Sequence, residues 1–211
     1  MDAPIPPPPA AKPANVVVLD DEARVGEMLS RLLSRAGYAV QIFSSPRKFL
    51  EEANLAAPCC LILDVAMPEL TGIEIQELLK RAEVPPAIVF MSGGADVPTS
   101  VKAMKAGAID FLSKPFANKD LLAAVDTALK RAAKDLELHG QILVARAAFS
   151  KLTPREQEVC QRVALGLKSK DIAGELGSAV KTVNIHRSRI MAKLGVESVA
   201  ELVRLVDLAT R

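Results

Sequence analysis

Five short apolar runs alternate with five amphipathic segments between residue 15 and about residue 131, and this alternation limits the possible folds more than any other feature. The runs at 15–20, 40–43, 59–64, 87–91 and 108–112 are predicted strands. Predicted helices lie between them at about 23–36, 46–54, 72–81 and 98–106, and a fifth begins near Asn118. Strict alternation of this kind predicts a doubly wound parallel sheet with helices on both faces. Such a sheet binds ligands at the carboxyl ends of its strands.

Acidic side chains follow two of the predicted strands directly. Asp20 and Asp21 come straight after the apolar residues 16–19, and Asp64 ends the third run. The first and third strands are neighbours in an open sheet of this connectivity, so the three carboxylates are expected to meet at one edge. Burying them unpaired would be costly, and a hard divalent cation with oxygen ligands, most simply Mg²⁺, would relieve their repulsion. A solvated acidic strand end is the alternative interpretation.

A hydroxyl and a cation are predicted at the same edge of the sheet. Ser92 follows the fourth run and Lys114 follows the fifth. Pro115 comes next, and a cis Lys114–Pro115 peptide bond would turn the lysine inward. Bound Mg²⁺ attracts phosphate, and catalysis of phosphoryl transfer is mostly positioning and charge neutralisation. The strand ends therefore predict one pocket with metal ligands, a nucleophile, a hydroxyl and a cation.

The charge of the chain changes along its length. Residues 1–118 carry 11 basic and 14 acidic side chains, residues 119–150 carry 5 and 4, and residues 151–211 carry 11 and 7. An acidic front and a basic back indicate two tasks, the second on nucleic acid. Between them, the helix from Asn118 is expected to continue toward Leu138 and to break or bend at His139 and Gly140.

The last part of the chain has the pattern of a helix-turn-helix module. Thr153, Pro154 and Glu156 predict a helix start with a capping box. A short helix is expected near 169–176, a turn at Gly177, and further helices at about 180–194 and 198–209. Helix, short turn, helix is the geometry that places a recognition helix in a DNA major groove.

The helix expected at 180–194 has two different faces. Val183, Ile190 and Leu194 mark an inward face, and the opposite face is expected to carry Lys181, Asn184, Ile185, Ser188 and Ala192. Its four basic residues, with no acid between them, are Lys181, Arg187, Arg189 and Lys193. A solvated basic face is the ordinary explanation, but the turn architecture favours DNA binding, with basic side chains on phosphates and a polar stripe on base edges.

Residues 15 to about 131 resemble the receiver domain of bacterial two-component response regulators, through "LDDE", "LILDVAMPELTG", "MSGG" and "DFLSKPF". The resemblance implies a flavodoxin-like fold in which Asp64 accepts a phosphoryl group from a sensor histidine kinase. By the same resemblance, Asp21, Asp64 and the backbone carbonyl of Ala66 bind Mg²⁺ directly, and Asp20 acts mainly through water. Three further residues then contact the phosphoryl group or switch with it: Lys114, Ser92 and Phe111. Simple core packing is the alternative for the aromatic residue.

Residues 152–206 resemble the LuxR-type helix-turn-helix module, through "LTPREQEV", "KSKDIAGELG", "KTVNIHRSRI" and "KLGV". The whole arrangement resembles response regulators of the FixJ/NarL class. The domains expected are a disordered Pro-rich lead-in at 1–14, a receiver at 15–131, a helical linker at 132–149 and the DNA-binding domain at 150–211. The resemblance implies that Asn184, Ile185 and Ser188 face bases, and that the DNA backbone is held by Lys181, Thr182, Arg187 and Arg189.

One position departs from the LuxR-type pattern. The family usually has an apolar residue and then Ser after the turn glycine, whereas Ser178 here precedes Ala179. Either Ser178 caps the recognition helix in a shifted register or the start of that helix frays.

The resemblance implies a cytoplasmic transcriptional regulator, phosphorylated in a Mg²⁺-dependent reaction and binding promoter double-stranded DNA as a homodimer. Its other partners would be the sensor kinase and RNA polymerase, with no membrane. A haloacid dehalogenase-type phosphatase is disfavoured because Ala66 stands where a general acid is needed, so slow self-dephosphorylation is expected of a protein that is not a dedicated enzyme. The main rival is a helix-turn-helix regulator whose receiver no longer accepts phosphate. Intact Asp20, Asp21, Asp64, Ser92 and Lys114 argue against it.

Overall fold

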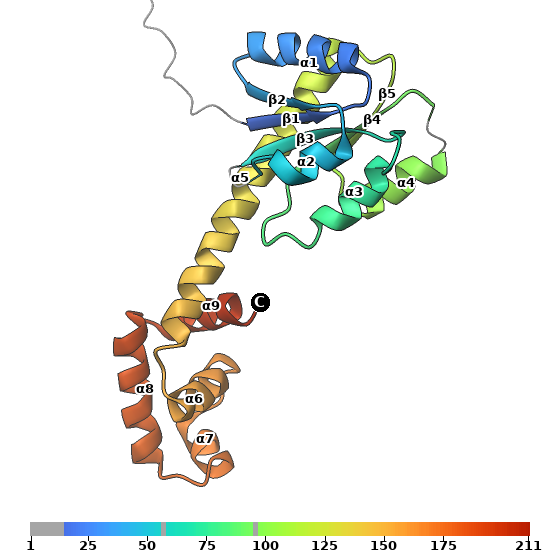
Figure 1. The fold of residues 1–211 in the computed structure, drawn as a ribbon. Coiled ribbons are helices and arrows are strands. Elements are labelled where there is room, and N and C mark those ends of the chain that lie inside the picture. The colour runs from blue at the N-terminus through green and yellow to red at the C-terminus, as the bar shows by residue number, and fades with distance from the viewer. Residues whose placement is uncertain (1–14, 56–57, 95–96) are drawn as a thin grey trace, which may run out of the picture. The chain divides into compact units, whose positions relative to one another are not determined.

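The computed structural model describes residues 15–55, 58–94 and 97–211 (Figure 1). The chain divides into two compact units, Met1–Leu136 and Glu137–Arg211. The Pro-rich segment at 1–14, which was predicted to be disordered, lies outside the described residues. Within the described ranges, none of the helices combines the length and the apolar composition that crossing a bilayer requires.

The first unit is built on a parallel sheet of five strands in the order β2-β1-β3-β4-β5, which confirms the predicted fold. The fifth strand begins two residues later than predicted, because the backbone N–H of Ala108 donates to Ala103 and closes the preceding helix instead. The strands are β1 (Asn15–Leu19), β2 (Ala39–Phe43), β3 (Cys59–Asp64), β4 (Ala87–Ser92) and β5 (Asp110–Ser113).

Helices cover both faces of this sheet (Figure 1). They are α1 (Ala23–Arg35), α2 (Pro46–Glu52), α3 (Gly72–Leu79), α4 (Val97–Lys105) and α5 (Asn118–Phe149). Alternate residues of a strand point to opposite faces, so Val16 and Val18 pack with α1 and α5, whereas Val17 and Leu19 pack with α2, α3 and α4. Both faces of the central strands are therefore buried, as the unbroken apolar runs predicted.

α5 continues from the first unit into the second without interruption (Figure 1). The break predicted at His139 and Gly140 was therefore wrong. A single glycine in a helix interior costs only about 1 kcal/mol relative to alanine, and its neighbours in "LELHGQILVARA" are mostly good helix formers.

The second unit adds four helices after α5: α6 (Pro154–Ala164), α7 (Ser169–Glu175), α8 (Val180–Leu194) and α9 (Val199–Thr210). α7, the turn at Gly177 and α8 form the predicted helix-turn-helix. Val183, Ile190 and Leu194 of α8 are buried in a core shared with the other helices, which confirms the inward face assigned to them.

The three cysteines, Cys59, Cys60 and Cys160, are free and buried in the hydrophobic cores. Burial raises the pKa of the Cys59 and Cys160 thiols to about 11.

The start of α6 has the predicted capping box. Thr153 accepts from the backbone N–H of Glu156, and the Glu156 carboxylate accepts in return from the backbone N–H of Thr153 at 2.8 Å. The start of α8 differs, since Ala179 is its N-cap and no side chain among the described residues caps it. Ser178 therefore does not cap α8 in a shifted register.

The Glu156 carboxylate also holds the end of α8. Its Oε2 accepts from Lys193 Nζ at 2.6 Å, and the glutamate is buried whereas the lysine is partly exposed. The hydrogen bond from Lys193, followed by the one from the Thr153 backbone, lowers the pKa of Glu156 to about 2. One buried carboxylate thus ties the first turn of α6 to the last turn of α8.

This pair predicts a pH-dependent stability of the second unit. Because the pKa of Glu156 is lower in the folded chain than its ordinary value of 4.5, its stabilisation is present above pH 4.5 and is lost as the pH falls toward 2. Glu156→Gln should lower the free energy of unfolding at neutral pH by on the order of 1–2 kcal/mol, and the difference from the unsubstituted protein should shrink at pH 3. Thermal unfolding of the intact chain, followed by calorimetry, measures it.

Glu158→Gln is the matched control for that experiment. Glu158 lies in the same helix and pairs with Arg155 at 2.8 Å, but both side chains are exposed. Exposed pairs contribute little, so this variant should change stability only slightly at either pH. Equal effects of the two substitutions would contradict the role given to Glu156.

Candidate functional site

The carboxyl edge of the sheet brings together the acids, the hydroxyl and the lysine that the sequence placed at strand ends. Asp20 follows β1, Asp64 ends β3, Ser92 ends β4 and Lys114 follows β5. Backbone hydrogen bonds fix this edge, since the N–H of Asp20 donates to Phe43 at 3.2 Å and that of Lys114 donates to Ser92 at 2.7 Å. The Lys114–Pro115 peptide bond is cis, as predicted.

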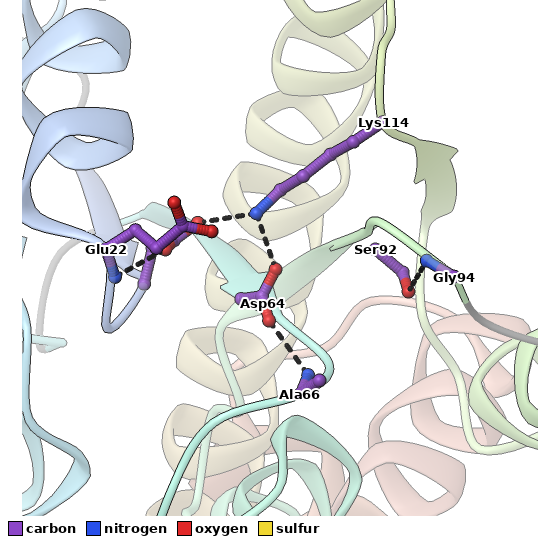
Figure 2. A network of polar contacts seen from close by, with 7 residues as sticks. Glu22, Asp64, Ala66, Ser92, Gly94 and Lys114 are labelled. Carbon is purple, nitrogen blue, oxygen red and sulfur yellow. Dashed lines mark hydrogen bonds and ion pairs between the residues drawn. The ribbon is translucent and has the colours of Figure 1, made fainter.

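Lys114 joins two buried carboxylates. Its Nζ lies 2.8 Å from Oδ2 of Asp20 and 2.7 Å from Oδ1 of Asp64 (Figure 2). The two aspartates are only 1% and 5% exposed. Burial alone would lower the pKa of Lys114, but the hydrogen bonds to Asp20 and Asp64 outweigh it and the pKa is raised. The side chain of Lys114 is therefore protonated and positively charged at neutral pH.

Backbone N–H groups hold the remaining oxygens of the site. The N–H of Ala66 donates to Oδ2 of Asp64 at 2.8 Å, and that of Glu22 donates to Oδ1 of Asp20 at 2.9 Å (Figure 2). The N–H of Gly94 donates to the hydroxyl of Ser92 at 3.3 Å. Asp64 thus has one oxygen on a lysine and the other on an amide, a set of donors that suits an oxyanion.

The loop after β3 approaches Asp64 closely. A Cβ atom at Gly72 would collide with the backbone carbonyl oxygen of Asp64 and would touch the ring of Phe90. The N–H of Gly72 donates to the carbonyl of Val65 at 3.0 Å. Glycine at the start of α3 therefore allows the loop to fold back beside the acidic edge.

At this edge lies an open depression with a volume of about 590 Å³, and the residues that line it include Asp64, Ala66, Ser92, Gly94 and Lys114. Asp21, exposed at the start of the β1–α1 loop, faces the same depression as Asp64 and Lys114. The residues that the structure describes contain no group of three acidic, histidine or cysteine side chains arranged to hold a metal ion. The ammonium group of Lys114 pairs with both Asp20 and Asp64 at this edge.

Phe111 lies on β5 and is partly buried. Its ring centroid is 6.1 Å from that of Phe90, and it packs against the core that α2, α3 and α4 share. This position is compatible with both the switch role and the packing role.

Some residues that line the depression were not singled out in the sequence, among them Glu22, Val65, Gly93 and Thr99. Glu22 lies within "LDDE" and Gly93 within "MSGG", so both motifs contained the signal. Thr99 comes from the first turn of α4 and had no local signal, because only the packing of α4 brings it to this edge.

The second candidate site is the outer face of α8. This face carries an open depression whose lining residues are exposed: Val180, Lys181, Asn184, Ile185, Ser188 and Arg189. Thr182 is also exposed. The structure therefore brings most of the predicted DNA-contacting residues onto one surface of the helix.

Two basic residues of α8 make contacts inside the unit. Arg187 is partly buried, and its Nη1 donates to the hydroxyl of Ser169 in α7 at 3.4 Å. Lys193 is paired with Glu156. These contacts hold α8 against α7 and α6, and they distinguish both residues from the open cations Lys181 and Arg189.

Comparisons with known proteins match a family model to each of the two units. Residues 16–126 match the family model for the response regulator receiver domain, and residues 150–206 match that for bacterial regulatory proteins of the luxR family. The chain is 43% identical over 192 residues to the response regulator protein TmoT of Ectopseudomonas mendocina, covering 91% of this chain and 87% of that protein.

It is also 38% identical over 193 residues to the transcriptional regulatory protein FixJ of Bradyrhizobium diazoefficiens, covering 90% of this chain and 93% of that one. Among solved structures, the response regulator StyR has 45% identity and a TM-score of 0.74, over 93% of this chain and 99% of that chain. The chain therefore belongs to the response regulators of the FixJ/NarL class and is a phosphorylation-dependent transcriptional regulator, with a receiver domain and a LuxR-type DNA-binding domain.

Proposed function

We propose that Asp64 is the phosphoryl acceptor and that a sensor histidine kinase is the donor. The observation that carries this proposal is the grip on the Asp64 carboxylate, which Lys114 and the N–H of Ala66 hold at 2.7 and 2.8 Å within an open depression. Such a carboxylate is fixed in place and accessible on one side, as a nucleophile requires.

The transfer itself needs few protein groups. A carboxylate oxygen of Asp64 attacks the phosphorus of a phosphohistidine, the new P–O bond forms as the P–N bond breaks, and the imidazole leaves with the bonding electrons. Lys114 would neutralise charge that develops on the phosphoryl oxygens, and Ser92, which lines the same depression, would donate its hydroxyl to them.

Mg²⁺ is the cofactor that this site would take. Asp20, Asp21, Asp64 and the backbone carbonyl of Ala66 offer the hard oxygen ligands that this ion prefers. When bound, Mg²⁺ supplies charge neutralisation for the phosphoryl oxygens. Asp20 and Asp64 are now held by Lys114, so the lysine would share these carboxylates with the ion.

Phosphorylation with acetyl phosphate and Mg²⁺ tests the assignment of Asp64. Intact mass measurement should show one added phosphoryl group on the unsubstituted protein and none on Asp64→Asn. Asp126→Asn is the matched control, because Asp126 is an exposed acid paired with Lys130 on α5, and it should be phosphorylated normally. Absence of phosphoryl groups on the unsubstituted protein would favour the rival in which the receiver serves only for association.

The phosphoryl group should be lost slowly but measurably, without a dedicated hydrolytic apparatus. Ala66 and Gly94 line the depression and are too small to shield a phospho-aspartate from water. Hydrolysis should therefore be slower in an Ala66→Met, Gly94→Tyr double variant, as measured by decay of the phosphorylated mass. A rate in the double variant equal to that of the unsubstituted protein would refute this explanation.

We propose that phosphorylation promotes dimerisation through the face formed by α4 and β5. Apolar side chains of α4 are exposed on this unit, namely Val97, Val101 and Met104. Ser92 and Phe111 link the pocket to β5, which pairs with β4. A measurement of molecular mass in solution should detect dimers only in the phosphorylated sample.

We also propose that the DNA-bound form contacts RNA polymerase and that the protein acts in the cytoplasm.

We propose that α8 reads promoter DNA through a division of labour. Lys181 and Arg189 are open cations suited to phosphates, whereas Asn184 presents an amide that can pair with an adenine edge. Arg187 would reach the DNA backbone from its position beside Ser169. In α9, Leu202 and Val206 are buried in the module, but Val199 and Val203 are 43% and 38% exposed and could hold two DNA-bound modules together.

Two substitutions separate charge from sequence readout. Lys181→Ala should weaken binding to specific and random DNA alike and lower the salt slope by about one unit, since its contribution comes from counterion release. Asn184→Ala should spare random DNA and relax the preference at one base pair per half-site by roughly 1–3 kcal/mol. Titrations of a half-site library at several salt concentrations measure both. Uniform loss of affinity in Asn184→Ala would remove that residue from base readout.

A further inference from the structure

α4 contributes a hydroxyl to the wall of the depression that contains Asp64. Thr99 lies in the first turn of this helix and lines the same depression as Asp64, Ser92 and Lys114. Ala66 and Gly94, which lie on the two loops beside Asp64, are small. The first turn of α4 therefore forms part of the wall of the same depression as Asp64.

The other end of α4 is fixed to the core. Ala103 is fully buried, and its carbonyl accepts both from the amide Nε2 of Gln76 in α3 at 3.2 Å and from the backbone N–H of Ala108 at 3.1 Å. Gln76 is itself buried. By contrast, Val97 in the first turn is 75% exposed. α4 is therefore held firmly near Ala103, whereas its first turn is less buried, with Val97 and Pro98 exposed and Thr99 half-buried.

A phosphoryl group on Asp64 would bring new acceptors into this space. It carries a charge of about −1.5 to −2 and three strong acceptor oxygens. Lys114 and Ser92 can donate to some of them, and a hydroxyl on the opposite wall could donate to another in a charge-assisted hydrogen bond. Of the side chains that α4 contributes to the described lining of the depression, Thr99 has such a hydroxyl.

We propose that the Thr99 hydroxyl donates to the phosphoryl group on Asp64 and draws the first turn of α4 toward the pocket. Thr99 would then be the second hydroxyl, after that of Ser92, to contact the phosphoryl group. It lies on α4, which carries the proposed dimer face. The inference rests on the proposed role of Asp64 as acceptor. The competing explanation for a hydroxyl in a first turn is helix capping, and that role needs no phosphoryl group.

Beryllofluoride with Mg²⁺, which imitates a phosphoryl group on aspartate, is the probe that separates the two roles. Calorimetric titration of the intact protein should give an affinity for beryllofluoride on the order of tenfold lower in Thr99→Val. Thr99→Ser should restore it, because serine keeps the hydroxyl. If Thr99→Val does not fold, Thr99→Ala against Thr99→Ser gives the same comparison. Thr127→Val is the matched control, since Thr127 lies on α5 with its hydroxyl on the carbonyl of Ala123.

The outcomes are distinct. Lower affinity in Thr99→Val, with recovery in Thr99→Ser and unchanged thermal stability without the probe, supports the proposal. The opposite result is an equal affinity for beryllofluoride in the unsubstituted protein, Thr99→Val, Thr99→Ser and Thr127→Val, with a lower stability of Thr99→Val in the absence of beryllofluoride. That result would indicate helix capping and would overturn the proposal. Failure of the unsubstituted protein to bind beryllofluoride would instead overturn the role of Asp64, and this inference with it.

Discussion

The receiver unit depends on a single lysine that neutralises two buried carboxylates. Asp20 and Asp64 are almost fully buried, and two unpaired carboxylates at that depth would cost far more than one domain can spare. Lys114 offsets this cost from a third strand, with both N–O distances below 3 Å. The ends of β1, β3 and β5 must therefore be in register for any of the three charges to be tolerated. The same requirement places Asp64, Ser92 and Lys114 at one edge of the sheet.

A comparable constraint operates in the DNA-binding unit. Glu156 is buried at the start of α6 and accepts from Thr153 and from Lys193 at the end of α8. Arg187 reaches Ser169 from the middle of α8. These two contacts use basic residues of the recognition helix to fix its position, so the cations left on its outer face can serve DNA. The basic residues of α8 thus fall into two groups: Lys193 and Arg187 hold the helix in place, and Lys181 and Arg189 are exposed to a ligand.

Sequence reasoning found what depends on local pattern and missed what depends on packing. Asp20, Asp64, Ser92 and Lys114 could be predicted to meet because the carboxyl ends of parallel strands share one edge. The capping box at Thr153 and Glu156 was equally legible. The prediction of a helix break at His139 and Gly140 was wrong, because the helix penalty of one glycine, about 1 kcal/mol, is outweighed by its strong helix-forming neighbours. Thr99 and the anchor at Gln76 had no signal, because only tertiary packing brings α4 to the pocket and to α3.

The charge around Asp64 explains how the phosphorylation proposed for this residue could act as a switch. Four acids lie at this edge of the sheet with Lys114. Asp20 and Asp64 are buried in ion pairs with the lysine, and Asp21 and Glu22 line the depression. One lysine already balances poorly against them, and replacing the single charge of Asp64 by that of a phosphoryl group increases the excess. The site is then stable only if it gains a cation or further donors. A divalent ion would meet the first need, and the hydroxyls of Ser92 and Thr99, which are proposed to contact the phosphoryl group, would meet the second. The electrostatic imbalance would then be converted into the proposed movement of α4.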